Sequence, residues 1–475
     1  MLLVCKLHIC LIYVIDNIIS IPHNIRYNCY MNDIYKLNLT HSTEVLALET
    51  TAEHLYQQGK YNELKALIEK FKDLLEIEDN KGAVFYDMGL LYSDLHSLNP
   101  NKDEKYLEKQ LYCYRQAISF FENNKEYANN LAFLKLYTNY ANNLRSVNRI
   151  VASCRYYRKA LLIDPNFYMA IGNYGVCLHF LAPYANQKHG SNINIDRNAY
   201  EMVMKAYESN DDEVYFSGAR EYWDEILSDL KSDKEYFDKV INTIVKYRCI
   251  EVEDEKHARW CLINHLLLDV ETEIEKYDFS YLFDELYIPN ISEDNKKMFD
   301  QLSQDYCYAR DKIFFYHESL DEIRIQDIRS IFSLLYSVFD KCAFFINIYY
   351  NLGFEERRAS AANVFKNQEF INLIQNNQVL NGIYYTYKEF EEKYGDSDRA
   401  FYRDFYDLRN GFEHRFVFLS DIETKIKIDT NEGNYLVSIK SLYNYTYELL
   451  LIVREIILYL YMSLINDDYT NHKSA

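Results

Sequence analysis

An arginine, an asparagine and a histidine lie close together in the segment LRNGFEHRF, residues 408–416. Arg409 is followed directly by Asn410, and His414 comes five residues after the arginine. A histidine with an ordinary pKa near 6.5 moves protons at neutral pH, and a guanidinium keeps its charge and stabilises negative charge that develops on phosphorus. Attack of an RNA 2′-hydroxyl on its own phosphate needs these two functions and no metal ion. Arg409 and His414 are therefore the candidate catalytic residues.

The spacing of the pair makes a geometric demand. Five residues on an ideal helix correspond to a rotation of about 140°, so both side chains reach one phosphate only where the helix is distorted or ends. Gly411, or a helix end near it, would supply that change. Looser versions of the pair occur in Arg259 with His265 and in Arg310 with His317. The spacing alone therefore also fits a surface helix with scattered charges.

The elements that must position this segment read as helices. We predict one over 396–419, with Asp396 or Ser397 as its N-cap, and a long apolar helix before it over 328–354. Asp340 is one of the few polar residues in that apolar run. Two short alternating segments, IKIDT and NYLVSI, follow the motif.

A long helix is predicted from about 440 to 465, near the end of the chain. Its apolar run from Leu449 to Ile465 carries Arg454 and Glu455 at the centre. Charges in that position favour a buried or dimer-facing helix over a membrane span.

The first half of the chain contains repeats between about residues 44 and 183. Large and small apolar residues fall at positions 4, 7, 8, 11, 24, 27 and 32 of a 34-residue frame, as Tyr137, Tyr140, Ala141, Leu144, Tyr157, Ala160 and Pro165. The first four positions recur upstream in Phe85, Met88, Gly89 and Tyr92, and downstream in Ile171, Tyr174, Gly175 and Leu178. This pattern predicts tetratricopeptide-like helical repeats, which present a concave surface to a protein or peptide partner. A generic helical bundle is the alternative.

Composition supports a helical chain and limits its partners. Only 12 glycines and 5 prolines occur in 475 residues, which leaves little turn chemistry for a β architecture. The 52 basic and 72 acidic residues give a net charge of −20, which repels nucleic acids and anionic membranes at long range. Binding of RNA therefore requires a local basic patch. Around the motif the charges nearly balance, with Arg399, Arg403, Arg409 and Arg415 against Asp404, Asp407 and Glu413.

The cysteines and the N-terminus bear on the cellular location. The ten cysteines form no C-x-x-C pair, so we expect reduced core residues in a cytoplasmic protein. Cys5, His8 and Cys10 are the only metal-like group, and no second pair of ligands follows at zinc-finger spacing. Residues 1–30 are apolar but interrupted by charges, and we interpret them as a doubtful upstream extension.

The motif LRNGFEH, the helix of the FDKCAFFINIYY type before it and the segment ARWCLINHLLLD at 258–269 together resemble the HEPN superfamily. The resemblance covers roughly residues 200–465 and is nearest to a bacterial branch in which the HEPN domain follows tetratricopeptide repeats. It implies a dimeric helical bundle in which two copies of the motif line one cleft, with metal-independent endoribonuclease activity of the toxin or antiphage-defence type.

The resemblance also implies roles for single residues. Arg409 would bind and stabilise the phosphate, Asn410 would be the polar motif residue that orients it, and His414 would be the acid or base. Asp340 would orient the arginine, or would be a buried polar residue satisfied within the bundle.

These inferences give an all-α chain of five parts: a doubtful extension at 1–30, repeats at 31–190, a helical connecting region at 191–295, a HEPN-like domain at 296–467 and a polar tail at 468–475. We expect an RNA substrate, a protein or peptide partner on the repeats, a homodimer through the C-terminal domain, and neither a cofactor nor a membrane. The alternative is a non-catalytic scaffold whose HEPN-like domain only dimerises or binds nucleotide or RNA.

Overall fold

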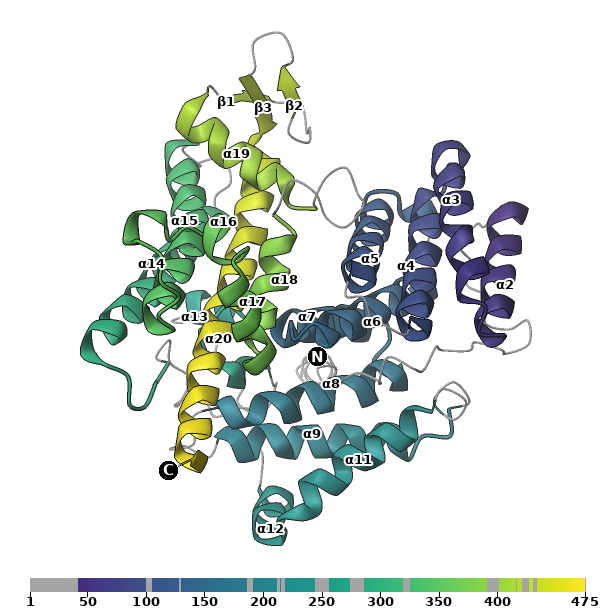
Figure 1. Ribbon diagram of the computed structural model, residues 1–475, viewed down its shortest axis with the longest axis horizontal. Coiled ribbons are helices and arrows are strands. Elements are labelled where there is room, and N and C mark those ends of the chain that lie inside the picture. The colour runs from purple at the N-terminus through teal and green to yellow at the C-terminus, as the bar shows by residue number, and fades with distance from the viewer. Residues whose placement is uncertain are drawn as a thin grey trace, which may run out of the picture. The chain divides into compact units, whose positions relative to one another are not determined.

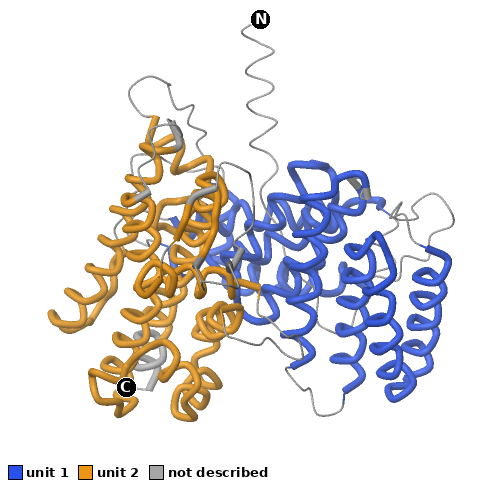
Figure 2. The backbone as a smooth tube through the Cα atoms, turned by 90° about the horizontal axis from the view of Figure 1, so that it is seen from above, with its two compact units in different colours: residues 1–247, 273–277, 393–398 blue, residues 248–272, 278–392, 399–475 orange. Residues whose placement is uncertain are grey.

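The computed structural model describes residues 42–99, 105–127, 130–185, 191–211, 214, 218–243, 256–273, 286–318, 325–390, 401–415, 417–420, 427–429 and 434–474. The chain forms two compact units, shown in Figure 2. The N-terminal unit comprises residues 1–247, 273–277 and 393–398, and the C-terminal unit comprises residues 248–272, 278–392 and 399–475. The predicted extension at 1–30, with Cys5, His8 and Cys10, lies outside the described residues.

Successive helix hairpins build most of the N-terminal unit (Figure 1). In chain order the helices are α2 (Thr43–Gln57), α3 (Tyr61–Ile77), α4 (Lys81–Leu98), α5 (Lys105–Asn123), α6 (Asn130–Ser146), α7 (Ile150–Ile163), α8 (Tyr168–Leu181) and α9 (Ser191–Tyr207). Short 3₁₀ helices, η1 (Lys125–Tyr127) and η2 (Ala182–Tyr184), follow α5 and α8. The all-α prediction with N-terminal helical repeats is confirmed.

The small residues of the repeat pattern lie where paired helices approach most closely. A side chain added at Gly89 of α4 would place its Cβ 2.4 Å from Tyr114 of α5, and one at Gly175 of α8 would lie 2.7 Å from the Ala199 carbonyl oxygen of α9. Ala141 of α6 is fully buried in the same position of its repeat. The repeat pattern is therefore a packing pattern, in which position 8 must be small.

Helices from the predicted connecting region belong to both units. Besides α9, the N-terminal unit contains α11 (Ala219–Ser232) and α12 (Lys234–Asn242). Trp223 of α11 is fully buried, packs against Gly172 and donates its Nε1–H to Asn173 at 3.2 Å. Helix α13 (Lys256–Ile263) belongs to the C-terminal unit. The 3₁₀ helix η4 (Val270–Glu273) lies where the chain passes between the units.

Three long helices form the core of the C-terminal unit: α14 (Glu293–Glu318), α15 (Ile325–Tyr349) and α20 (Ile439–Ser474). Shorter elements complete it, namely η7 (Glu356–Arg358), α16 (Ala361–Val364), α17 (Gln368–Asn376), α18 (Leu380–Lys388) and α19 (Arg403–His414). Within the described residues, one helix, Gln326–Tyr349, is long and apolar enough to cross a membrane. Since 56% of its apolar window is buried and it packs against α14, α16, α19 and α20, it has the surroundings of a core helix.

The charged centre of α20 anchors the segment that follows α13. Arg454 is 3% exposed, donates its Nε–H to the Leu267 carbonyl at 2.7 Å and donates from Nη2 to Thr272 Oγ1 at 2.9 Å. The predicted buried helix at the end of the chain is confirmed, because its arginine is satisfied by backbone carbonyls of the same unit.

A small sheet follows α19, and the prediction that this helix continues to residue 419 is wrong. Strands β1 (Val417–Ser420), β2 (Lys427–Asp429) and β3 (Asn434–Ser438) have the order β1-β3-β2, with β1 parallel and β2 antiparallel to β3. The helix predicted over 396–419 spans only Arg403–His414 among the described residues, and its predicted caps Asp396 and Ser397 lie outside them. Arg415 is extended, and the next residues pair with β3 in the register Val417 to Tyr435. That pairing is non-local, so helical periodicity could not reveal it.

Candidate active site

Helix α19 is held by an apolar face against α15 and α20. Its buried residues Phe405, Leu408 and Phe412 recur at helical spacing. The Phe332 ring of α15 makes edge contacts with Phe405 and Phe412, at centroid distances of 6.0 and 5.7 Å. Tyr445 of α20 contacts Phe405 at 5.3 Å. Asn410 and His414 lie on the opposite side of α19, whereas Arg409 lies at the edge of the apolar face, beside Tyr336 of α15.

Gly411 brings the end of α19 against the small sheet. A Cβ at this position would lie 2.7 Å from Tyr435 Cδ2 and 3.2 Å from Val417 Cγ2. The helix continues through Gly411, and Arg415 donates its backbone N–H to the Gly411 carbonyl at 3.0 Å. The helix therefore runs through His414 without a break at Gly411, and Arg409 and His414 approach each other only through their side chains, which both lie near Glu413.

Arg329 of α15 fixes the same helix end and was missed from the sequence. Its Nη2 donates to the Phe412 carbonyl, and its guanidinium lies 5.6 Å from the centre of the Phe412 ring. A cation at the C-terminal carbonyls of a helix satisfies an otherwise unpaired acceptor and favours the helix dipole. No local signal announces this role, because 83 residues separate the two partners.

The structure brings Arg409 and His414 to one carboxylate oxygen. Arg409 Nη1 lies 3.1 Å from Glu413 Oε2, and His414 Nε2 lies 3.6 Å from the same atom. The side chains of Arg409, Glu413 and His414 are 30%, 40% and 70% exposed. Asn410 Oδ1 accepts a hydrogen bond from Arg409 Nη1 at 3.1 Å. One negatively charged oxygen can therefore contact both candidate catalytic groups, although they stand five residues apart.

The ring of Tyr336, on α15, packs against the Arg409 side chain. The Arg409 guanidinium lies 5.9 Å from the centre of the Tyr336 ring, within the range of a cation–π contact. Burial raises the pKa of Tyr336 above its ordinary value, and the Asp340 carboxylate raises it further, whereas Arg409 opposes the rise. The phenol is therefore neutral at physiological pH and offers Arg409 an uncharged ring.

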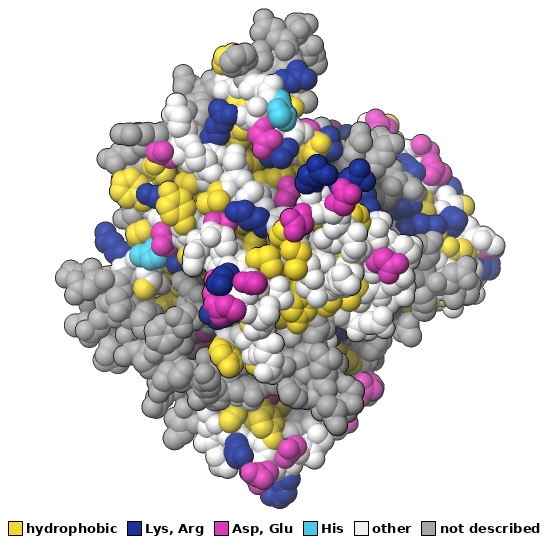
Figure 3. Space-filling model, turned by 60° about the vertical axis from the view of Figure 1, so that its left-hand side comes forward, with side chains coloured by type: hydrophobic (Ala, Val, Ile, Leu, Met, Phe, Trp, Pro, Cys, Tyr) yellow, Lys and Arg dark blue, Asp and Glu magenta, His cyan; other side chains and the backbone are white. Residues whose placement is uncertain are grey.

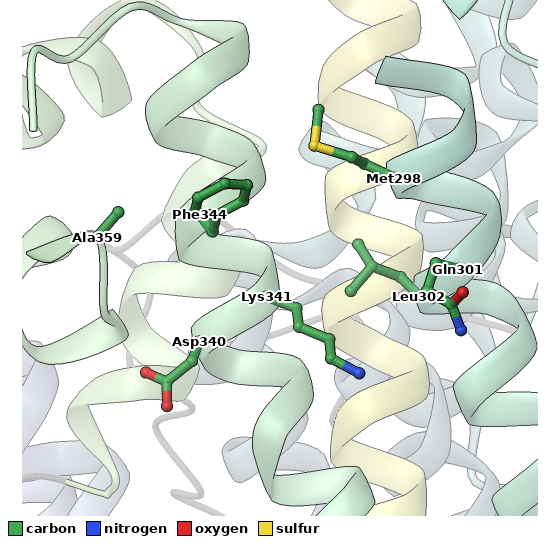
Figure 4. A pocket seen from close by; sticks show the side chains of 7 residues that line it. All are labelled: Met298, Gln301, Leu302, Asp340, Lys341, Phe344 and Ala359. Atoms are coloured by element: carbon green, nitrogen blue, oxygen red, sulfur yellow. The ribbon is translucent and has the colours of Figure 1, made fainter. Parts of the chain in front are cut away.

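Asp340 lies near Tyr336, but its hydrogen bond is with the backbone of α16. Its Oδ1 accepts a hydrogen bond from the Ala361 backbone N–H at 2.9 Å, at the first turn of α16. It also lines a pocket of about 420 Å³ between α14 and α15. In Figure 4 its carboxylate lies on the side of α15 that faces Ala359, away from Lys341. The observed contact is the alternative in which Asp340 is satisfied within the bundle. The charges of Asp340 and Arg409 both act on Tyr336.

Charges near the motif are mixed, but several are already paired. Arg403 Nε lies 3.2 Å from Asp407 Oδ1, and its guanidinium stacks at 4.1 Å on Tyr406. Figure 3 shows basic and acidic side chains interspersed over the visible face. In the described part of the chain, no group of three or more His, Cys, Asp or Glu side chains is placed to hold a metal ion.

Comparison with known proteins gives one match. Residues 315–467 match the family model described as LA2681-like HEPN. The matched segment contains Arg409, Asn410, His414 and Asp340, and it includes α15, α19, the small sheet and most of α20. No curated protein and no solved structure matches the chain.

Proposed function

We propose that this chain, whose residues 315–467 belong to the HEPN superfamily, is an endoribonuclease that needs no metal ion. The observation that supports this most directly is the approach of Arg409 and His414 to a single carboxylate oxygen at the end of α19. A carboxylate oxygen and a phosphate oxygen are both anionic acceptors, so the same two donors suit an RNA phosphate.

The proposed reaction is an internal transesterification. The RNA 2′-oxygen attacks phosphorus, the bond to the 5′-oxygen breaks, and the products are a 2′,3′-cyclic phosphate and a 5′-hydroxyl. Arg409 pairs with the non-bridging oxygens and stabilises the charge that they gain in the transition state, while Asn410 holds its guanidinium. His414, at 70% exposure, is accessible to move a proton from the 2′-hydroxyl or to the leaving oxygen.

A homodimer through the C-terminal unit completes the proposal. Two motifs in one cleft supply two histidines, one as base and one as acid, and two arginines for one phosphate. The N-terminal repeats bind a protein or peptide that controls the activity, as expected for a cytoplasmic toxin or antiphage-defence enzyme.

Cleavage of RNA by the purified protein in EDTA tests the proposal. We expect Arg409→Ala and His414→Ala each to lower the cleavage rate by about 10²- to 10⁴-fold, the range for removal of a positioned acid, base or charge stabiliser. Arg357→Ala is the matched control, because Arg357 is 91% exposed and its loss removes the same charge from the same unit. Sedimentation of each variant verifies an unchanged oligomeric state.

Two results would contradict the proposal. Equal loss in Arg357→Ala would show that overall charge, and not the motif, governs cleavage. Absence of cleavage by the unsubstituted protein, alone and with candidate partners of the repeats, would support the non-catalytic scaffold that dimerises or binds nucleotide or RNA.

A further inference from the structure

Glu413 occupies the position where the two candidate catalytic groups meet. Its Oε2 is 3.1 Å from Arg409 Nη1 and 3.6 Å from His414 Nε2. An RNA phosphate that contacts both donors must take the place of this carboxylate, because two anions in one site repel each other. A phosphate and the Glu413 carboxylate therefore cannot occupy this position at the same time.

The position of Glu413 on α19 makes the carboxylate easy to displace. Glu413 lies in the last turn, where the helix dipole disfavours a negative charge. The arginine precedes the glutamate by four residues, which is the less favourable order for such a pair. Both partners are more than a quarter exposed, so water screens their attraction. Release of Glu413 therefore costs little compared with the contacts that a phosphodiester makes.

We propose that Glu413 is an internal counter-anion, which pairs with Arg409 beside His414 and swings away when a phosphodiester takes its place. The inference rests on the proposed function in that the incoming anion is an RNA phosphate. It assigns Glu413 a positioning and competing role and no proton transfer.

The chain offers a close control for this role. Arg403 and Asp407 form a second arginine–acid pair on α19 with the same four-residue spacing and order. Asp407→Asn removes the same charge from the same helix as Glu413→Gln does. It leaves the group at Arg409 intact, so it separates a local effect from a change of net charge.

Binding of a fully 2′-O-methylated RNA oligonucleotide, which cannot be cleaved through a 2′-hydroxyl, tests the inference by fluorescence anisotropy at fixed ionic strength. We expect Glu413→Gln to tighten binding about fivefold, the size of effect of one weak exposed ion pair, and Asp407→Asn to change it less than about twofold. In the Arg409→Ala background the same Glu413→Gln change should give no gain, because the carboxylate then has no arginine to occupy.

The outcomes separate this inference from the proposed function. Equal tightening by Glu413→Gln and Asp407→Asn, or a gain that persists without Arg409, overturns the counter-anion role even if the enzyme cleaves RNA. Failure of every variant to bind the oligonucleotide overturns it as well. The expected tightening, together with no cleavage of unmodified RNA in EDTA, supports the counter-anion and overturns the ribonuclease.

Discussion

Arginine–glutamate pairs occur in both units, and they differ in how far water reaches them. In the N-terminal unit, Arg158 Nη1 lies 2.6 Å from Glu273 Oε2, with the two side chains 9% and 0% exposed. Tyr174 closes this pair, because its hydroxyl accepts from Arg158 at 3.1 Å and donates to the Glu273 carbonyl at 2.7 Å. In the C-terminal unit, Arg409 and Glu413 are 30% and 40% exposed beside an open histidine.

This difference in exposure decides whether each arginine can exchange its glutamate for another anion. A buried pair that loses one partner leaves a charge without compensation in a medium of low dielectric constant, so Arg158 and Glu273 depend on each other. An exposed pair gains little from its own attraction and can exchange its carboxylate for another anion. The same residue types thus form a buried link between α7 and Glu273 in one unit and an exposed, exchangeable pair on α19 in the other.

The largest expected effect is on stability, at the buried pair. Arg158→Met should lower the free energy of unfolding by about 3 kcal/mol, because Glu273 stays buried without its cation. Arg409→Met should change it by less than about 0.5 kcal/mol. Trp223 and Trp260, the two tryptophans, lie one in each unit, so Trp223 fluorescence in a Trp260→Phe background reports denaturation of the N-terminal unit.

The double variant Arg158→Met/Glu273→Leu is the control for that experiment. It should recover most of the loss, since an apolar pair replaces a salt bridge at similar volume. If Arg158→Met were as stable as the unsubstituted protein, the buried Arg158–Glu273 pair would matter no more for stability than the exposed Arg409–Glu413 pair.

Packing at Gly411 is expected to have the next largest effect. Gly411→Ala should destabilise the C-terminal unit by about 1 to 3 kcal/mol and slow cleavage, because its Cβ would push Tyr435 and the end of α19 apart. Trp260 fluorescence in a Trp223→Phe background measures the stability. Tyr435→Ala should act less than additively with Gly411→Ala. A stabilising Gly411→Ala, as helix propensity alone predicts, would contradict the close approach.

Replacement of Arg329 should lower the stability of the C-terminal unit less than Gly411→Ala does. We expect Arg329→Gln to destabilise the C-terminal unit by about 1 kcal/mol, the size of one hydrogen bond, and to lower cleavage severalfold while leaving binding of the 2′-O-methylated RNA within about twofold. Arg357→Gln in the same unit is the charge-matched control. If binding fell as much as cleavage, Arg329 would contact RNA directly, as is proposed for Arg409, and would not act only through the end of α19.

The smallest expected effect is a pH dependence in the N-terminal unit. Burial alone would lower the pKa of His179, but hydrogen bonds to Asp196 at 2.8 Å and to Asp229 at 3.2 Å outweigh it and raise the pKa above 6.5. The stability that this charge contributes is fully present below pH 6.5 and is lost as pH rises through the higher folded-state pKa. The free energy of unfolding, measured by urea denaturation at a series of pH values, should fall less steeply above pH 6.5 in His179→Gln than in the unsubstituted protein. An identical pH dependence of the two proteins would exclude this contribution.

Much of the fold follows from local pattern. The small residues at Gly89, Ala141 and Gly175 and the large ones around them predict helix pairs, because the side chains that meet lie within neighbouring helices. The predicted apolar helix at 328–354 appears as α15, slightly shifted, because its period is strong. The end of α19 escaped prediction, since residues 417–420 become a strand only by pairing with β3.

The candidate site divides in the same way. Arg409, Asn410 and His414 could be predicted as candidates from the sequence because they are close along the chain and chemically apt; their roles stay a prediction. Arg329 and Tyr336 could not be predicted, because they reach α19 from another helix. Glu413 entered the sequence analysis only as one charge in a balance. Asp340 had two interpretations, orienting the arginine or being satisfied within the bundle, and its hydrogen bond from the Ala361 N–H agrees with the second.

The sequence by itself determined the helical class, the helical repeats and the residue types of the motif, because each depends on residue type and on spacing along one helix. Only the tertiary structure decided that α19 ends at His414 and that Gly411 and Arg329 hold this end in place. It also decided that one carboxylate oxygen lies between the arginine and the histidine. Where a helix stops depends on what packs against its end, and here those partners come from residues far away in the chain.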